Sequence, residues 1–294
     1  MADAVAAAPP DQEHRLPDGR VLAYCEYGVP DGSPVFIFHG LPGSRIDARV
    51  VAEEMRAAGV RLIAPDRPGI GRSDPVPGKR TYAGCAHDVA HLAGALGIDR
   101  FSVVGYSCGG PYALAAAAGL PERIEKAGLI SSVATSEMPG YRKGLASTDR
   151  TMTVLSRYAP WLARMLMGGA VKQARTKAEK FGKQLDRELG APSDRALLDQ
   201  GLRPVVTELF LECNRNGPAG TVEDFAVWAR PSGIDFEKVK APTHLWHGDA
   251  DESVSIDHSR WLASKIPGAE LTVVPGAGHL HPPERWREIT AALL

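Results

Sequence analysis

The sequence predicts an α/β domain with a mostly parallel sheet of the eight-stranded type, helices on both faces of the sheet, and an inserted helical segment. Short, largely apolar runs alternate with stretches of helical pattern, which indicates buried strands joined by crossover helices. The runs are "VFIFHG", "VRLIAPD", "FSVVGYS", "KAGLISS", "PTHLWHGD" and "ELTVVPG". The alternation stops between about Ala134 and Gly233.

Local signals justify the other elements in chain order. Residues 13–28 are expected to form a β-hairpin, because Asp18-Gly19 lies between two strand-like runs and favours a tight hairpin turn. Segments with helical spacing of apolar or small residues follow the apolar runs. The expected helices cover residues 47–58, 81–98, 109–120 and 258–265, with a last helix beginning near Pro283.

The break in the alternation divides the chain. Residues 15–133 and 233–294 are expected to form one sheet domain. Residues 134–232 are expected to form a helical cap inserted into it, because about 100 residues suit a small domain. This segment is rich in charged, helix-like stretches. The first 14 residues are expected to be a flexible tail.

Composition excludes several classes of protein. The 294 residues are 44% hydrophobic, and 34 basic against 35 acidic residues give a net charge of -1. A large core is therefore expected, without nucleic acid or a membrane surface as partner. No run approaches the roughly 18 apolar residues of a membrane span, and the N-terminus does not resemble a signal peptide, so we expect a cytoplasmic protein. The widely spaced cysteines favour reduced thiols over disulfides or a zinc site. They are Cys25, Cys85, Cys108 and Cys213.

The stretch "VVGYSCGG" contains the first candidate for chemistry, Ser107. It lies where a buried strand is expected to meet a helix, with Gly105 two residues before it and Gly109 two residues after it. A tight turn of this kind leaves no room for flanking side chains, and it exposes the central hydroxyl at the carboxyl edge of the sheet. In this context a chemically inert glycine-rich turn is the less favoured alternative.

A serine hydroxyl is a weak nucleophile that needs a base, and the base needs an orienting acid. "PGAGHLHPP" places His279 just after an expected strand, at the same edge of the sheet, with His281 two residues further on. "LWHGDADESV" offers Asp249 and Asp251 after the preceding strand. The chain order serine, aspartate, histidine is the one expected for this topology.

Four blocks in this order resemble the α/β-hydrolases, and in particular their capped branch of esterases and epoxide-hydrolase-like proteins. The blocks are "HGLPGS", "DRPGIGRSD", "GYSCGG" and the pair "HGDADESV" with "GAGH". Together they cover the expected sheet domain from about Leu16 to Leu294, without the insertion. The resemblance implies an α/β-hydrolase fold with a lid domain, a nucleophile elbow and a catalytic triad.

The resemblance selects one member of each candidate pair. The acid is Asp251, because the family pattern G-x-x-D-x-x-V matches Gly248, Asp251 and Val254. Asp249 is then a turn residue. The base is the histidine of the G-x-G-H block, His279, because its neighbour two residues on falls outside that pattern.

The resemblance also implies an oxyanion hole made by the backbone N–H groups of Leu41 and Cys108. Position 108 begins a helix, so the positive end of the helix dipole lies near the developing negative charge. Cys108 is expected to contribute its backbone rather than its sulfur, although a reactive thiol at a helix N-terminus is the alternative.

The implied activity is that of a serine hydrolase without cofactor or metal. Its substrate would be a small-to-medium, largely hydrophobic carboxylic ester, thioester or lactone. A carbon–carbon bond hydrolase or a peracid-forming relative would use the same triad. Epoxide hydrolases and haloalkane dehalogenases are disfavoured, because they carry aspartate where this chain has Ser107. An alternative of another class is a ligand-binding protein or receptor that keeps the hydrolase shell with little turnover. The oligomeric state is not predicted.

The insertion is expected to shape the substrate pocket. "YAPWLARMLMGG" has an apolar helix face that would roof the pocket or pack the cap onto the sheet domain. Residues 171–190 predict a mixed-charge helix with a solvated face. The candidate substrate contacts are Tyr106, Trp161, Met165, Phe210 and Trp228.

Other polar residues favour structural interpretations. His87 and His91 lie four apart like a zinc pair, but no third ligand is evident and an ordinary outer helix is expected. The loop "DRPGIGRSD" lacks the lysine of a phosphate loop, so Asp66, Arg67 and Arg72 are expected to be structural. His247 at a strand end is expected to be a packing residue.

Overall fold

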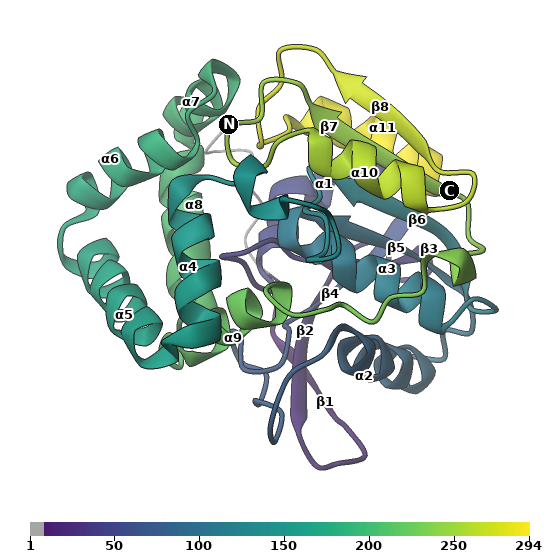
Figure 1. Ribbon diagram of the computed structural model, residues 1–294. Helices are drawn as coiled ribbons and strands as arrows, with labels where there is room; N and C mark the ends of the chain where they lie inside the picture. Colours follow the sequence, from purple (N-terminus) through teal and green to yellow (C-terminus); the bar gives the residue numbers. More distant parts are fainter. Residues whose placement is uncertain (1–8) are drawn as a thin grey trace.

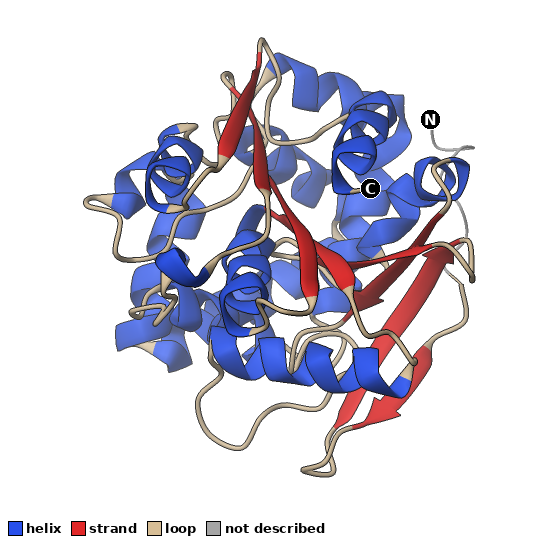
Figure 2. Cartoon of the chain, turned by 90° about the vertical axis from the view of Figure 1, so that its right-hand side faces the viewer, coloured by secondary structure: helices blue, strands red, loops and turns tan. Residues whose placement is uncertain are grey.

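Within residues 9–294, the part of the chain that the computed structural model describes, eight strands form one twisted sheet (Figure 2). The strands are β1 (Gln12–Arg15), β2 (Val21–Gly28), β3 (Ser33–Phe38), β4 (Val60–Pro65), β5 (Phe101–Tyr106), β6 (Ile124–Ile130), β7 (Thr243–Gly248) and β8 (Glu270–Val274). Their order is β1-β2-β4-β3-β5-β6-β7-β8. β2 runs antiparallel to β1 and β4, and all other pairs are parallel. The predicted mostly parallel α/β sheet is confirmed.

Helices cover both faces of the sheet, as predicted. α1 (Ala52–Ala57) and α11 (Pro283–Leu293) pack on one face. α2 (Tyr82–Ala95), α3 (Gly110–Gly119) and α10 (Asp257–Lys265) pack on the other. The expected helix over residues 47–58 is a 3-10 turn, Asp47–Val51, that continues into α1.

The chain between β6 and β7 contains helices in place of strands. These are α4 (Ser147–Tyr158), α5 (Pro160–Thr176), α6 (Ala178–Glu188), α7 (Pro192–Leu197), α8 (Arg203–Cys213) and α9 (Ala219–Trp228). α4 to α8 gather beside the sheet in Figure 1, next to the carboxyl ends of the strands. A π-helical segment, Leu198–Leu202, joins α7 to α8.

Two expectations for local structure are wrong. The single mixed-charge helix over residues 171–190 is broken at Lys177 into α5 and α6, and α6 buries Phe181 and Leu185 rather than presenting a purely solvated face. The flexible tail is shorter than expected, because Gln12 to His14 belong to β1 and pair with β2. Asp11 forms ion pairs with two arginines at the sheet edge. Residues 1–8 of that tail lie outside the described part of the chain.

Candidate active site

Ser107 sits at the strained turn between β5 and α3. Its φ of 52° is in the left-handed region, which residues other than glycine rarely adopt. A Cβ added at Gly105 would lie 2.6 Å from the carbonyl oxygen of Gly109, and one added at Gly109 would lie 2.0 Å from the carbonyl oxygen of Phe38. Both glycines are therefore required by close backbone approach, as the sequence predicts.

Replacing Gly109 with alanine is expected to lower the free energy of unfolding by about 1–3 kcal/mol, because the new methyl group meets backbone that cannot rotate away. Chemical denaturation measures this loss. Gly119→Ala at the end of the same helix is the matched control, since a Cβ there has no neighbour within 4 Å, and it should change the stability by less than about 0.5 kcal/mol. Equal effects of the two changes would contradict the steric account.

The structure brings the three predicted triad residues together. The Nε2 atom of His279 lies 3.0 Å from Oγ of Ser107, and Nδ1 of His279 lies 2.7 Å from Oδ2 of Asp251. Ser107 and His279 are buried, and the Asp251 side chain is fully buried. The serine comes from the end of β5, the aspartate from the loop after β7, and the histidine from the loop after β8, so three loops at one edge of the sheet supply the group.

Hydrogen bonds fix the Asp251 carboxylate in an ionised state. Its Oδ1 atom accepts the backbone N–H groups of Ser253 and Val254 at 2.9 and 2.8 Å. Its Oδ2 atom lies 3.2 Å from Nε2 of His247. Burial acts to raise the pKa of this carboxyl, but the charge of His279 and the hydrogen bonds from His247 and His279 bring it well below its usual range.

The same pairing acts on the base. Burial acts to lower the pKa of His279, but the charge and hydrogen bond of Asp251 outweigh burial and raise it above its ordinary value. Because the ionised Asp251 carboxylate can only accept, Nδ1 of His279 carries the hydrogen of that pair, and Nε2 is left to accept from the Ser107 hydroxyl.

The two rejected candidates have other partners. Nε2 of His281 lies 2.9 Å from Oγ of Ser131, away from Ser107, and burial lowers its pKa to about 3. The Asp249 carboxylate accepts the backbone N–H of Gly276 at 2.7 Å and so closes a turn. His247 is more than a packing residue, because it bridges Asp251, Ser259 and the carbonyl of Val254.

The loop that carries Leu41 is held by a buried ion network. Arg67 donates to the carbonyl oxygens of His39 and Gly40, and its guanidinium pairs with Asp224 of α9. Burial acts to raise the pKa of Asp224, but the charges of Arg67 and Arg80 lower it to about 2. Arg67 therefore ties the predicted oxyanion loop to the inserted helices, a structural role in line with its sequence interpretation.

The remaining members of that sequence block are also structural. Asp66 is fully buried and accepts the backbone N–H groups of Arg45 and Arg72. Arg72 pairs through its side chain with Asp11. Leu41 lines the cavity beside Ser107, and Cys108 follows Ser107 in the 3-10 turn Ser107–Gly109. Their role as oxyanion donors stays a prediction.

Sequence reasoning missed Asp194, a buried residue in the first turn of α7. Its two carboxylate oxygens accept the backbone N–H groups of His279 and Leu280, both at 2.9 Å. The adjacent Ser193 hydroxyl accepts the N–H of Gly278 at 2.8 Å. Two successive side chains of the insertion thus bind three successive amides of the histidine loop. The only signal in the sequence is the helix start "PSD", which does not indicate a distant partner.

We expect Asp194→Ala to lower kcat by about 10- to 100-fold in any reaction in which His279 acts as the base, because two buried amides lose their acceptor and the imidazole is no longer held in place. Asp194→Asn, which keeps one acceptor oxygen, should retain most of kcat. Rescue by asparagine, with KM nearly constant, distinguishes positioning of His279 from general loss of fold. A kcat unchanged in the alanine variant would contradict this role.

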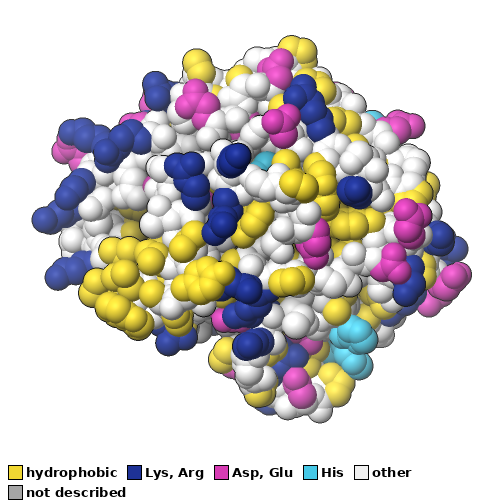
Figure 3. Space-filling model, viewed as in Figure 1, with side chains coloured by type: hydrophobic (Ala, Val, Ile, Leu, Met, Phe, Trp, Pro, Cys, Tyr) yellow, Lys and Arg dark blue, Asp and Glu magenta, His cyan; other side chains and the backbone are white. Residues whose placement is uncertain are grey.

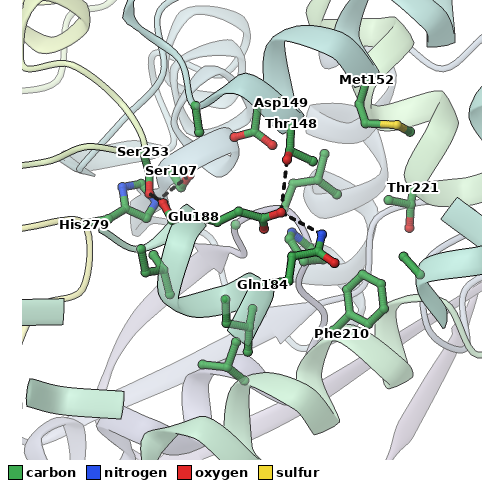
Figure 4. Close-up of a pocket in the computed structure, with 18 of the residues that line it drawn as sticks. Ser107, Thr148, Asp149, Met152, Gln184, Glu188, Phe210, Thr221, Ser253 and His279 are labelled. Atoms are coloured by element: carbon green, nitrogen blue, oxygen red, sulfur yellow. Dashed lines mark hydrogen bonds between the residues drawn. The ribbon is translucent and has the colours of Figure 1, made fainter. Parts of the chain in front are cut away.

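A cavity of about 470 Å³ opens beside Ser107 and His279 (Figure 4). It lies between the carboxyl edge of the sheet and α4, α5, α6 and α8. Of the five predicted substrate contacts, Tyr106 and Phe210 line it. Its apolar wall includes Met152, Leu166, Met167, Phe181, Leu185, Val206, Leu209 and Phe225.

The other three predicted substrate contacts are wrong. Trp161 and Met165 are 69% and 60% exposed, because the apolar face of α5 that bears them faces outward, where hydrophobic side chains gather in Figure 3. Trp228 is buried in the packing of the insertion, and its indole N–H donates to the carbonyl of Ala134 at 2.8 Å. Residue type alone does not distinguish a side chain that lines the cavity from one that is exposed on the surface or buried between helices.

Other groups that the sequence singles out are separate from the cavity. His87 and His91 are exposed on α2, and among the described residues no group of histidine, cysteine and carboxylate side chains is arranged to hold a metal. The four cysteines are free thiols, and burial raises the pKa of Cys108 well above its usual value, which disfavours a thiolate there. No helix in the described part of the chain is both long and apolar enough for a membrane span.

The sheet and the strand-to-helix turn at Ser107 define the class of the protein as an α/β hydrolase. Comparison with known proteins agrees: a family model described as the alpha/beta hydrolase fold matches residues 33–284, and the chain belongs to that family.

Several known proteins are similar to this chain. It is 27% identical over 273 residues to a 2-hydroxymuconate semialdehyde hydrolase of Pseudomonas putida, covering 89% of this chain and 84% of the relative. It is 30% identical over 234 residues to a 2-hydroxy-6-oxo-6-phenylhexa-2,4-dienoate hydrolase of Burkholderia cepacia, covering 76% and 72%. An esterase structure from Exiguobacterium antarcticum superimposes with a TM-score of 0.72 over 96% of this chain and 97% of the esterase, and its 18% identity shows the fold alone.

Proposed function

We propose that this protein is a serine hydrolase that cleaves a small-to-medium, largely hydrophobic carboxylic ester, thioester or lactone. In this proposal Ser107 Oγ attacks the carbonyl carbon while His279 takes its proton. Asp251 holds the imidazole and stabilises the imidazolium that forms. His279 then protonates the leaving group, and water releases the acyl group from Ser107 by the same steps in reverse.

Charge that develops on the carbonyl oxygen needs fixed donors. The backbone N–H groups of Leu41 and Cys108 are assigned to this role. Arg67, which is paired with Asp224, donates to the carbonyl of Gly40 and so holds the loop that carries Leu41. The apolar wall of the cavity favours a hydrophobic acyl or alcohol part. No step in this scheme needs a cofactor or a metal.

One observation carries the proposal: a continuous hydrogen-bonded chain from Ser107 through His279 to Asp251, with the serine at a strained turn on the floor of the cavity. A serine that only packs in a protein core has no need of a positive φ, a histidine that accepts from its hydroxyl, and a buried carboxylate behind that histidine. The combination of the three favours a nucleophile.

The test is hydrolysis of p-nitrophenyl esters of graded acyl length, followed by release of p-nitrophenol. We expect turnover with a burst, and an acyl adduct on the peptide that contains Ser107 after rapid acid quench. Failure to hydrolyse any ester, thioester or lactone by well-folded protein would overturn the proposal.

A second candidate function is hydrolysis of a carbon–carbon bond beside a carbonyl group with the same three residues. The relative named for 2-hydroxy-6-oxo-6-phenylhexa-2,4-dienoate favours it, because a compound of that name has no ester bond and its hydrolysis must cleave between carbons. Loss of the dienoate chromophore on incubation with this protein, faster than turnover of any ester, would favour this candidate over the first.

A further inference from the structure

The polar lining of the cavity is acidic. Its carboxylates are Asp47, Asp149 and Glu188. Among the described residues that line it, none is lysine or arginine, and His279 is the one titratable base. A ligand carboxylate in this space would therefore meet like charge and no fixed cation apart from a protonated His279.

The three carboxylates differ in their hydrogen bonding. Glu188 accepts from the Thr148 hydroxyl at 3.0 Å and from the Gln184 amide at 2.8 Å, and Asp47 accepts the backbone N–H of Ser44 at 2.9 Å. The Asp149 carboxylate has no hydrogen bond and no ion pair to any residue in the described range. Figure 4 shows this contrast, with hydrogen bonds drawn to Glu188 and none to Asp149 beside Thr148.

Asp149 lies in the first turn of α4, whose N-terminus faces the cavity. The positive end of a helix dipole favours a negative charge. At the N-terminus of α4 the carboxylate of Asp149, and not a ligand anion, supplies that charge. The ionisable groups around Asp149 are Glu188 from α6, His279 from the loop after β8 and Cys108 after β5. Asp47 also lines the cavity. Burial and the charge of Glu188 raise the pKa of Asp149 to about 7 against the lowering effect of His279.

We propose that Asp149 is a specificity-determining residue that makes the cavity reject substrates bearing a carboxylate and accept neutral ones. This inference rests on the proposed function, because it names the substrate class of the same site. An unpaired carboxylate in the cavity wall can accept a hydrogen bond from a ligand donor, and it repels a ligand anion.

The acidic groups of the cavity lining also distinguish this protein from two relatives that it resembles. The two relatives named for a muconate semialdehyde and a dienoate are named for compounds that carry a carboxylate. A cavity with three carboxylates and no lysine or arginine in its described lining does not offer such a compound a cationic partner. The inference therefore favours the ester or lactone candidate over the carbon–carbon candidate.

The test compares three p-nitrophenyl esters of equal chain length: the hexanoate, the 6-hydroxyhexanoate and the adipate monoester, whose far end is a carboxylate. At pH 8 we expect kcat/KM of wild type for the adipate monoester to be about 30-fold or more below that for the other two. Asp149→Asn should shrink this ratio about 10-fold. The matched control, Asp257→Asn, removes an exposed carboxylate in the first turn of α10, outside the cavity, and should leave the ratio unchanged.

The pH dependence of the same ratio gives a second readout. Rejection of the adipate monoester should strengthen as pH rises from 6 to 8 in wild type, because Asp149 and Asp47, whose pKa values burial raises to about 7, lose their protons over this range. The increase should be clearly smaller in Asp149→Asn, where only Asp47 of the two still titrates. Loss of the proton of His279 raises the turnover of all three esters, and it also removes the one cation that would attract the adipate carboxylate, so this part of the pH dependence remains in Asp149→Asn. A wild-type ratio within twofold of one, or a ratio that Asp149→Asn does not change, would overturn the inference.

If the proposed function is wrong, none of the three esters is turned over, and this outcome differs from every outcome that overturns the role of Asp149. In that case calorimetric binding of adipamide and of adipic acid monoamide still decides the inference. Tighter binding of the neutral diamide, with the difference lost in Asp149→Asn, supports it. Equal or tighter binding of the anion overturns it.

Discussion

Replacing Ser107 with alanine is expected to lower kcat/KM for a p-nitrophenyl ester by about 10⁴-fold or more, because the nucleophile is lost while the binding cavity and the predicted oxyanion donors remain. The change removes one hydroxyl whose hydrogen-bond partner is His279, and the Cβ atom stays at the same strained φ. The free energy of unfolding should therefore change by less than about 1 kcal/mol.

Steady-state kinetics with a denaturation curve on the same samples checks this prediction. Cys108→Ser is a matched control, since the neighbouring residue is assigned a backbone role and should keep activity within about tenfold. Residual activity above one-hundredth of wild type in Ser107→Ala, or its loss in Cys108→Ser with the fold intact, would point to a different nucleophile.

Asp251→Asn is expected to lower kcat by about 10³- to 10⁴-fold, because the amide does not stabilise the imidazolium and favours the wrong tautomer of His279. The pH profile should change as well. The base acts in its neutral form, so activity rises with pH through the pKa of His279, and Asp251 raises that pKa. Without the carboxylate the acidic limb should move to lower pH while the plateau falls.

The pH dependence of kcat/KM for both proteins measures this shift. Asp249→Asn is the matched control two residues away, where the side chain accepts an N–H of a surface turn and not the imidazole. Its plateau and its limb should match those of wild type. A limb that moves to higher pH in Asp251→Asn, or an equal loss in Asp249→Asn, would contradict the assignment of the acid.

Much of the fold could be predicted because each strand is encoded locally. The runs that become β3 to β7 are largely apolar, as is typical of strands covered on both faces, whereas β8 at the sheet edge is only partly buried. The helices between the strands show their own spacing. The elbow was predictable for a similar reason, since Gly105 and Gly109 are imposed by contacts within a few residues and with the neighbouring strand. Chain order and the family pattern were enough to choose Asp251 and His279.

The cavity wall could not be predicted, because it depends on how distant helices pack. The apolar residues of α5 point both inward and outward, so Met167 lines the cavity while Trp161 is exposed. Asp194 contacts amides 85 and 86 residues away, and no periodicity or motif records that pairing. The break at Lys177 has no local signal either, because no proline or glycine lies between residues 171 and 181.

The most direct test of the account is the intact mass of wild type and of Ser107→Ala after reaction with a fluorophosphonate, which reacts preferentially with activated serine hydroxyls. The account predicts one adduct on wild type and none on the variant. An adduct that persists in Ser107→Ala, or no adduct on well-folded wild type, would contradict an activated Ser107, and the second result would favour a ligand-binding protein that keeps the hydrolase shell.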